Sequence, residues 1–366
     1  MKKLFLTLTL MAAISEAHAQ KLDITFEQHI INLKQEIDAK GYDSTIIDQV
    51  FDNKFVRDKR VSKALKNQPE VKFTFDKYVN GKLSSWRITT GRKLYKQHFK
   101  VLKKVEEKYK VDAAVVVALW GVETNYGTYP LSHNAFKALT NMTYTHSRAS
   151  RRQFFKNELF DLFEVAKQNE LDPLELKASW AGALGQCQFM PSNVLNYAVD
   201  GNDDGKVDIW NTVEDVFASA ANFVNKLGWD SSVSTNYEEI TYPANFNIFA
   251  KRVYKPVSQW EAKQVLFKNG YEDINKQAKM KIFAPVNRAN EVFLVSKNLD
   301  VIKRWNNSDY FAFSVLKLAD EIKKPDPEEI KTAEQAKKKE EIKDNKTTKS
   351  NITKNGGNNE TSKITN

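Results

Sequence analysis

The sequence predicts a mainly helical α+β protein. Apolar residues recur at three- and four-residue steps over most of 21–155, as in Phe26, Ile30 and Leu33, and this spacing is typical of amphipathic helices. Between residues 231 and 299 the spacing gives way to short apolar runs bounded by Pro and Asn, which indicates strands. The chain is 41% hydrophobic and 28% charged, so a sizeable core can form in a water-exposed protein.

The first residues have the layout of a secretory signal. Two lysines precede an apolar stretch, 4–14, which is too short to span a bilayer. The sequence Ala17-His18-Ala19 fits a cleavage site, so we expect residues 1–19 to be removed and the mature chain to be exported and soluble. No cysteine follows the apolar stretch, which argues against a lipid anchor, and no later run is long enough for a transmembrane helix. A core helix is the alternative interpretation of this segment.

Residues 111–122 form the most apolar part of the helical region. Three consecutive valines occupy 115–117 and the segment is apolar nearly all round, so we expect a helix in the protein interior. Helical spacing returns at 159–166 and 213–223, and a last helix is expected at about 311–322.

A small β insert is expected at about 231–299. Short apolar runs bounded by turn residues predict its strands, which are expected at 240–242, 248–250, 280–283 and 291–295. From residue 331 on the sequence has no aromatic residue and is rich in Lys, Glu, Asn and Thr. Such a composition cannot bury enough surface to offset the entropy of ordering, so we expect 324–366 to be a disordered basic tail.

Charge and cysteine content exclude several classes of protein. The formal net charge of +10 favours an anionic partner without choosing among nucleic acid, a membrane surface and an acidic polysaccharide. A single cysteine, Cys187, excludes a disulfide scaffold and a Cys-based metal site, and we interpret it as a small buried hydrophobe. The mean hydropathy of -0.55 excludes a protein with many membrane spans.

Glu123 is the first candidate for chemistry. It directly follows the apolar helix, where desolvation would favour the protonated carboxyl group, as a general acid requires. Gly121 and Gly127 leave room for a ligand close to the backbone. From spacing alone, a capping or ion-paired carboxylate without a chemical role remains the alternative.

Residues 179–192 are a candidate ligand-binding turn. Small residues alternate there with amides and aromatics, and a proline interrupts the run. This is a poor composition for a core and a good lining for a groove that hydrogen-bonds neutral polar groups such as sugars. A tight turn beside a helix explains the composition equally well.

Residues 200–211 have the spacing of an EF-hand calcium loop. Oxygen-bearing side chains fall at positions one, three, five and nine, with Gly205 at six and the Lys206 carbonyl at seven. Position twelve is Asn211 instead of a bidentate acid, which should weaken binding unless an acid at 214–215 substitutes. An acidic turn closed by side-chain hydrogen bonds is the alternative. The expected ligands of a structural Ca²⁺ are Asp200, Asn202, Asp204, Lys206, Asp208 and Asn211.

Three long motifs follow one another in a fixed order. They are Gly121-Val122-Glu123-Thr124-x-Tyr126-Gly127, then Ala181-Gly182-Ala183-x-Gly185-x-x-Gln188-Phe189-Met190-Pro191-Ser192, then the Asp200 loop ending in Ile209-Trp210. Together they closely resemble the membrane-bound lytic murein transglycosylase B family, over roughly residues 68–318. The resemblance implies a catalytic region at 20–323, with a lysozyme-like core at about 101–230 and helical parts from both ends. A helical domain and the small β domain would then surround a groove.

The resemblance also implies an activity. Members of this family cleave the β-1,4 bond between N-acetylmuramic acid and N-acetylglucosamine in periplasmic peptidoglycan and leave 1,6-anhydromuramic acid ends, a reaction of cell-wall turnover and remodelling. Glu123 would serve as acid and then as base, and no cofactor would be required for the chemistry. The alternatives are a non-catalytic peptidoglycan-binding scaffold and a lysozyme-like muramidase hydrolase. Nucleic-acid binding is disfavoured by the export signal, and glycan strands are the expected partner, with cell-wall synthases or amidases as further partners.

The family's substrate residues match ten positions of this sequence. An arginine pair among them would meet peptide-stem carboxylates, which suit a planar guanidinium. Three aromatic residues stand where the family usually has tyrosine, which keeps stacking and loses phenolic hydrogen bonds. Because the chain lacks the lipid-attachment cysteine, a soluble form is expected despite the family name. The implied substrate residues are Tyr78, Arg151, Arg152, Ser179, Gln188, Phe189, Phe223, Trp305, Asn306 and Phe311.

Overall fold

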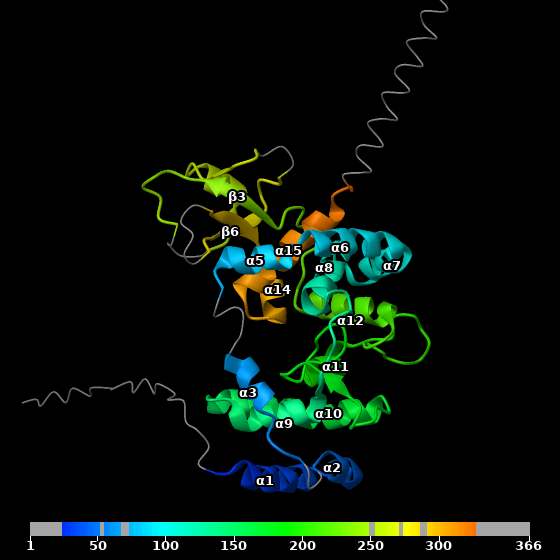
Figure 1. Cartoon of the computed structure of the whole chain (residues 1–366). Helices are drawn as coiled ribbons and strands as arrows, with labels where there is room; N and C mark the ends of the chain where they lie inside the picture. The colour runs from blue at the N-terminus through cyan, green and yellow to red at the C-terminus, as the bar shows by residue number, and fades with distance from the viewer. Residues whose placement is uncertain are drawn as a thin grey trace, which may run out of the picture.

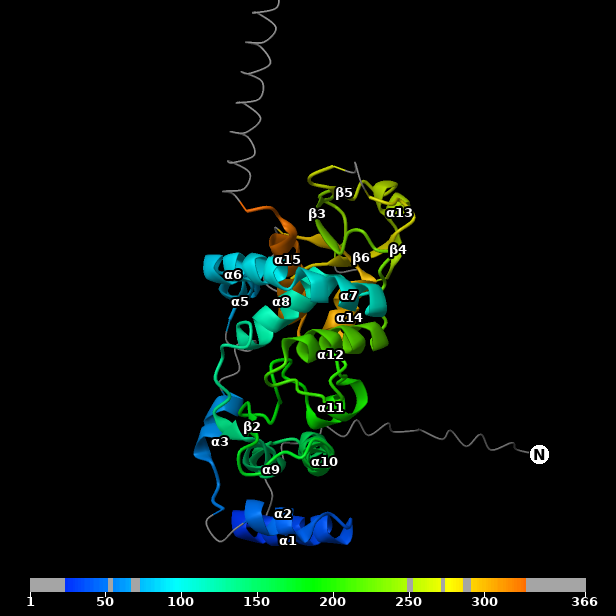
Figure 2. The ribbon, with the colours of Figure 1, turned by 90° about the vertical axis from the view of Figure 1, so that its right-hand side faces the viewer.

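The computed structural model describes residues 24–51, 55–66, 73–248, 253–270, 274–285 and 291–326. The expected signal peptide, the tail beyond residue 326 and most of the strand expected at 248–250 lie outside these residues. Figures 1 and 2 show the described elements stacked along one direction. Helices α1 (Phe26–Ala39) and α2 (Ser44–Val50) lie at one end, and the strands between residues 237 and 296 lie at the other.

Helices make up most of the described chain. The first group runs from the N-terminal end to the helix that carries Glu123: α1 (Phe26–Ala39), α2 (Ser44–Val50), α3 (Lys59–Lys66), α5 (Phe75–Lys82), α6 (Ser85–Gln97), α7 (Phe99–Tyr109) and α8 (Ala113–Thr124). The later helices are α9 (Ala135–Thr145), α10 (Ala149–Gln168), α11 (Pro191–Tyr197), α12 (Val213–Lys226), α13 (Val257–Glu261), α14 (Lys297–Trp305) and α15 (Asp309–Lys323).

The strands form two sheets in the described residues. β1 (His133–Asn134) pairs with β2 (Lys177–Ala178) in a two-stranded antiparallel ribbon. The larger sheet has the order β4-β6-β7-β3-β5, and each of its neighbouring pairs is antiparallel. Its strands are β3 (Tyr237–Thr241), β4 (Lys255–Pro256), β5 (Leu266–Phe267), β6 (Lys279–Phe283) and β7 (Phe293–Ser296).

Helix α8 is the centre of the main core. It contacts α6, α7, α12 and α15, and every one of its residues is buried except Glu123. The Asp112 side chain caps the helix by accepting the backbone N–H of Ala114 at 2.8 Å. A helix buried on all sides requires an all-round apolar sequence, which explains the valine-rich run at 113–122.

Strand β7 belongs to two hydrophobic cores. Phe293 and Val295 pack into the main core, whereas Leu294 packs into a second, smaller core. Successive side chains of a strand point to opposite faces, so one buried strand serves both. The small core consists of Ile240, Val257, Trp260, Val265, Phe267, Met280, Ile282, Ala284, Val292 and Leu294.

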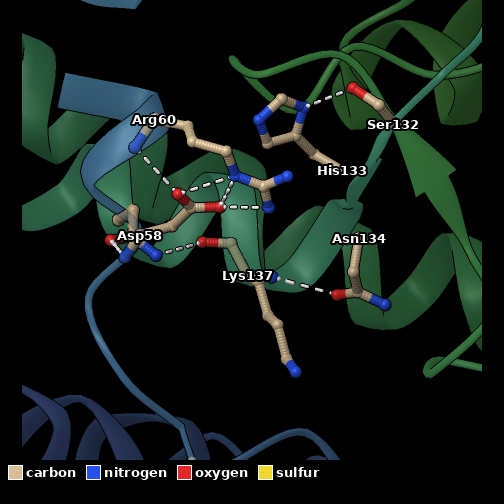
Figure 3. Close-up of polar contacts among 7 residues, drawn as sticks. Asp58, Arg60, Ser132, His133, Asn134 and Lys137 are labelled. Carbon is tan, nitrogen blue, oxygen red and sulfur yellow. Dashed lines mark hydrogen bonds and ion pairs between the residues drawn. The ribbon is translucent and has the colours of Figure 1, made fainter. Parts of the chain in front are cut away.

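A polar contact holds the chain just before α3 against α9, and an ion pair closes the start of α3 (Figure 3). The backbone N–H of Asp58 donates to Asn141 Oδ1 at 2.7 Å. Arg60 pairs with the Asp58 carboxylate at 2.6 Å, and this hydrogen bond holds the pKa of Asp58 below its usual value. His133 lies on the neighbouring ribbon and contacts Ser132 Oγ through Nδ1 at 3.2 Å.

The expected mainly helical α+β fold is confirmed. The apolar run at 111–122 forms α8, three of the expected strands form β3, β6 and β7, and the last expected helix forms α15. The division into a core at 101–230 and a β insert at 231–299 stays a prediction. Among the described residues, no helix is both long and apolar enough to cross a bilayer.

Candidate active site

Glu123 lies one residue before the end of α8, where the chain turns sharply. Asn125, Tyr126 and Gly127 follow with φ of 50°, 61° and 76°, and the N–H of Asn125 closes the helix on the Gly121 carbonyl at 3.2 Å. A Cβ on Gly127 would lie 2.1 Å from Gln186 Oε1, so only glycine fits there. The turn therefore leaves Glu123 half-buried at the end of a buried helix.

Two cations from other helices satisfy the carbonyls at the end of α8. Arg87 of α6 donates from Nε to the Gly121 carbonyl at 3.1 Å and also contacts the Asn125 side chain. Lys82 of α5 donates from Nζ to the Val122 carbonyl at 3.2 Å. The last turn of α8 has no basic residue of its own, so these cations supply the positive charge that a helix C-terminus favours. They fix the helix end that carries Glu123.

Gln186 of the second motif is hydrogen-bonded to both of the other motifs. Its Oε1 accepts from Trp120 Nε1 of α8 at 2.7 Å, and its Nε2 donates to the Trp210 carbonyl of the third motif at 2.8 Å. Thr124 Oγ1 donates to the Gln186 carbonyl at 3.0 Å. The motifs that are separate in sequence thus form one hydrogen-bonded unit beside Glu123.

The Met190-Pro191-Ser192 segment is anchored by a buried carboxylate. Glu158 of α10 is 4% exposed and accepts the Ser192 N–H at 2.9 Å and the Ser192 hydroxyl at 2.8 Å. Burial raises the pKa of Glu158, and the two Ser192 hydrogen bonds oppose that rise. This contact fixes the start of α11 and the turn that precedes it.

Aromatic rings form a wall beside Glu123. Trp305, at the end of α14, donates from Nε1 to Glu123 Oε1 at 2.8 Å. The indole packs against Phe189 and Phe223, with ring centroids 5.3 and 5.0 Å away. Phe223 in turn stacks on Tyr197 at 4.3 Å. The carboxyl group therefore faces a polar donor that is itself held by apolar contacts.

Cys187 lies in the apolar wall behind Glu123. The two residues line a small void together with Leu119, Phe217, Trp305 and their neighbours. Burial, and then the charge of Glu123, raise the pKa of the thiol far above its usual value. The thiol donates to the Val216 carbonyl at 3.3 Å, which agrees with its interpretation as a buried hydrophobe.

The Asp200 loop is closed by its own hydrogen bonds. The Asp200 carboxylate accepts four backbone N–H groups, from residues 202–205, and Gly205 has φ of 86°. The Asn211 amide donates to the Asp208 carboxylate at 3.0 Å. In the part of the chain that is described, no three His, Cys, Asp or Glu side chains form a metal-binding group.

Asp215 does not take the missing twelfth position of the loop. Its carboxylate is buried and accepts the N–H groups of Gly201 at 2.7 Å and Asp208 at 2.6 Å. It therefore ties the two halves of the loop together from the protein side. The sequence-based option that an acid at 214–215 completes the calcium site is not supported for Asp215.

The expected substrate residues fall into two sets. Ser179, Gln188, Trp305 and Asn306 are partly exposed, and so is Arg152, while Arg151 is exposed. The other four are core residues in this structure: Tyr78 is 5% exposed, Phe189 1%, Phe223 5% and Phe311 2%. Such burial leaves little of each ring for a sugar, and the role of these four residues in substrate binding stays a prediction. Their burial indicates that they support the site from behind.

The arginine pair is held in two different ways. Arg152 donates from Nη1 to the carbonyls of His146 and Ser147, both at 2.9 Å. The Arg151 guanidinium lies over the rings of Phe154 and Phe155, at 4.5 and 5.0 Å. Stacking on the rings leaves the edge of the Arg151 guanidinium available for an anion, whereas Nη1 of Arg152 is already used by two backbone carbonyls.

Several residues that build the site were not selected from the sequence. Arg87 and Lys82 gave no local signal, because their acceptors lie on α8 more than 30 residues away. Gln186 did carry a signal, since it lies in the amide-rich turn next to Gly185. A cleft of ≈ 1040 Å³ between 168–177 and 205–211 is not lined by Glu123.

Comparison with known proteins identifies the architecture. The family described as the Transglycosylase SLT domain matches residues 25–320. The chain belongs to this family. The match covers most of the described residues, including all three motifs and the segment that carries Trp305.

Individual relatives of the Transglycosylase SLT domain agree with this assignment. Membrane-bound lytic murein transglycosylase B of Escherichia coli (strain K12) is 34% identical over 142 residues, which is 39% of this chain and 38% of that protein. The chain therefore matches well under half the length of this curated relative.

Two solved structures share the fold of this chain. SltB3 from Pseudomonas aeruginosa, in complex with NAG-NAM-pentapeptide, is 31% identical with a TM-score of 0.75, over 82% of this chain and 80% of that chain. Slt35 from Escherichia coli, in complex with calcium, is 23% identical with a TM-score of 0.67, over 80% and 92%. The second likeness shows the fold alone. The lysozyme-like core that the sequence resemblance implied is thereby confirmed.

Proposed function

We propose that this Transglycosylase SLT domain protein is a lytic transglycosylase that cleaves peptidoglycan glycan strands. The observation that carries the proposal is the convergence of the three motifs on one carboxyl group. Gln186 links all three motifs, and Glu123 lies where they meet, with its Oε1 accepting from Trp305. The complex of SltB3 with NAG-NAM-pentapeptide supports a muramyl peptide as the substrate class.

Glu123 would carry both proton transfers. In its acid form it gives a proton to the oxygen that links N-acetylmuramic acid to N-acetylglucosamine, and the bond from that oxygen to muramyl C1 breaks. The muramyl C6 oxygen then bonds to C1 while its proton passes to the Glu123 carboxylate. The acid form is restored and no water is consumed. Because the nucleophile is part of the substrate, one carboxyl group is enough, unlike the carboxylate pair of most glycosidases.

We propose that the exposed members of the predicted set bind the substrate. Ser179, Gln188 and Asn306 offer neutral hydrogen-bonding groups suited to sugar hydroxyl and acetamido groups. Arg151 offers a guanidinium edge for the carboxylates of the stem peptide. Trp305 keeps an aromatic contact in addition to its bond to Glu123. The domain limits given above, 20–323 for the catalytic region and 324–366 for the tail, are part of this proposal.

We propose that Ca²⁺, if it binds, serves the Asp200 loop and not the chemistry. The loop offers only oxygen ligands from Asp200, Asn202, Asp204, Lys206, Asp208 and Asn211, as Ca²⁺ prefers. The Asn211 amide now donates to Asp208, so a cation would compete with that hydrogen bond. We expect weak binding: millimolar Ca²⁺ should raise Tm of the wild type, with no change for Asp204→Asn. Equal shifts in both proteins would contradict the site.

The site of action follows from the N-terminal sequence. We propose that residues 1–19 direct export and that the remaining chain works in the periplasm. Glycan strands would be the partner, and cell-wall synthases or amidases the protein partners. Mass spectrometry of the exported protein tests the cleavage: a first residue other than Gln20 would contradict it.

Product analysis tests the activity. Purified peptidoglycan is digested with the full mature chain, and the released muropeptides are weighed. We expect anhydromuropeptides, about 18 Da lighter than the products of hydrolysis, since no water enters the bond. Reducing muramyl ends would make the protein a lysozyme-like hydrolase, and no release at all would leave it a wall-binding scaffold.

A further inference from the structure

Trp305 is placed to control which oxygen of Glu123 carries the proton. Its indole Nε1–H donates to Oε1 at 2.8 Å across 182 residues of sequence. The bond joins the end of α14 to the end of α8, two helices that meet only through tertiary packing. The expectation from the sequence was a stacking role on substrate, and the structure gives the indole a polar partner instead.

The indole is held in place by rings from two other segments. Phe189 comes from the second motif and Phe223 from α12, at 5.3 and 5.0 Å from the Trp305 ring. Both phenylalanines are almost fully buried. A ring packed in this way has few alternative rotamers, so the direction of its N–H is fixed by the core.

An indole N–H is a donor only, because the lone pair of the ring nitrogen is part of the aromatic system and does not accept a hydrogen bond. A protonated carboxyl group has one O–H donor and keeps acceptor capacity, and its carbonyl oxygen accepts an N–H better than its hydroxyl oxygen does. A phenol or an amide could donate or accept and would impose no such choice. The indole bond to Oε1 therefore favours the form of protonated Glu123 that carries its proton on Oε2.

We infer that Trp305 is a positioning residue that reserves Oε1 as an acceptor and makes Oε2 the oxygen that gives and regains the proton. The inference rests on the proposed transglycosylase mechanism for its purpose, although the hydrogen bond itself does not. One oxygen would then serve both half-reactions without rotation of the carboxyl group. The N–H bond also strengthens when Glu123 becomes a carboxylate, which is the state reached after the first proton transfer.

The other polar and charged groups near Glu123 are the same in the wild type and in a Trp305 variant. Lys82 of α5 and Arg87 of α6 donate to the carbonyls of residues 122 and 121, and the Cys187 thiol feels the Glu123 charge. Substitution of Trp305 leaves all three in the chain. A change in the titration of Glu123 between wild type and variant therefore reports the indole.

Hydrogen exchange of the Trp305 indole N–H tests the inference without any turnover. In full-length protein studied by NMR, we expect this N–H to stay protected at pH values on both sides of the Glu123 titration. It should also stay protected in Glu123→Gln, whose amide can place its oxygen at Oε1 and its donor at the Oε2 position. Protection should be lost in Glu123→Ala. Loss of protection when wild-type Glu123 becomes protonated would overturn the assignment of the proton to Oε2.

The pH profile of cleavage supplies the second test. Trp305→Phe keeps an aromatic ring and removes the donor, so the Glu123 carboxylate loses a charge-assisted bond and its pKa should rise. Because the free enzyme must be protonated at Glu123, the alkaline limb of kcat/KM should move up by about one pH unit, and kcat should fall about tenfold.

The matched control is Trp260→Phe in the small core, where the indole donates to the Met280 carbonyl at 2.8 Å. This control variant should leave the alkaline limb of the kcat/KM profile at its wild-type pH. An unmoved limb in Trp305→Phe, or the same shift in both variants, would refute a positioning role. Failure of the proposed activity would appear differently, as a wild type that releases no anhydromuropeptide while its indole N–H remains protected.

Discussion

The part of the main core around Glu123, here called the corner, and the small β core are assembled in different ways. The corner consists of Glu123, Trp120, Gln186 and Trp305, and polar contacts between distant segments join it, such as Trp305 to Glu123 and Gln186 to Trp120. The small core is apolar, and its members all lie between Ile240 and Leu294. Its sheet pairs strands along that same stretch. Polar contacts have directions and fix atoms, whereas apolar packing fixes shape and volume.

This difference indicates that the two regions have different roles. A proton donor needs a defined position for one oxygen atom, which directional hydrogen bonds provide. A supporting domain needs only a stable surface, which an apolar core provides. Substitutions in the two regions should therefore separate: changes at the corner should alter turnover, and changes in the small core should alter stability.

The largest effect is expected from Glu123→Gln. The amide cannot give or take the proton, so turnover should fall by about three orders of magnitude, while Tm should change little. The matched control is Glu239→Gln on β3, whose exposed pair with Lys268 should matter neither for turnover nor for stability. Release of muropeptides is the measurement. Release of muropeptides by Glu123→Gln at the wild-type level would contradict the proposed role of Glu123 as the acid. Retained function of the protein without release of muropeptides would favour a scaffold.

A pair of leucines tests whether the two cores share one stability. Leu294 lies in the small core and Leu299 in the main core, both 1% exposed. Truncation of either to alanine should cost about 2–5 kcal/mol of unfolding free energy. Because β7 packs into both cores, we expect a single unfolding transition in each variant. At a temperature where both variants are folded, turnover should be higher in Leu294→Ala than in Leu299→Ala. The reason is that Leu299 lies on the helix that carries Trp305.

Denaturant unfolding followed at two wavelengths would check this pair. Two separate transitions in Leu294→Ala would mean that the small core unfolds alone, and the shared strand would then not couple the two cores.

Arg87→Met should affect both stability and turnover. The variant leaves the Gly121 carbonyl and its neighbours without their donor, which should cost about 2–4 kcal/mol, and the end of α8 would lose its fixed position. Arg92 of the same helix is a suitable control, since it donates to the Glu321 carbonyl at 2.9 Å, away from Glu123. Arg92→Met should lower Tm without a matching loss of kcat. Equal losses of kcat in the two variants would show that α6 acts only through general stability.

The smallest effect is a pH dependence from a polar contact outside the corner. His29 of α1 contacts Thr143 Oγ1 at 2.7 Å, and burial, followed by the charge of Lys156, lowers the pKa of His29 below its ordinary value of 6.5. The unfolded chain therefore binds the proton first as the pH falls. The contribution of His29 to stability is complete above about pH 6.5 and is lost as the pH falls towards the lowered pKa.

The expected loss is small, because the charge of Glu36 opposes the lowering of the His29 pKa. It is measured as the change in unfolding free energy between pH 8 and pH 5 for wild type minus that for His29→Gln. A variant that loses as much stability as wild type over this range would remove His29 as the cause. The apolar small core offers no such titration, which again separates the two modes of assembly.

Much of the fold could be predicted because the signals for it are local. The all-apolar run before Glu123 predicted a buried helix, and α8 is one. The short apolar runs at 280–283 and 291–295 predicted strands, which form β6 and β7. The burial of Phe189, Phe223 and Phe311 could not be predicted, because an aromatic residue of a groove and one of a core have the same local sequence.

The sequence by itself determined the buried helix before Glu123, three strands of the larger sheet, the order of the three motifs and the position of Glu123 at the end of that helix. These follow from periodicity and turn chemistry, which act over a few residues. Only the tertiary structure decided that Trp305 donates to Glu123 and that Arg87 and Lys82 close α8. Those partners are 182, 34 and 40 residues apart, and they meet because packing of the helices, not local spacing, sets where each side chain ends.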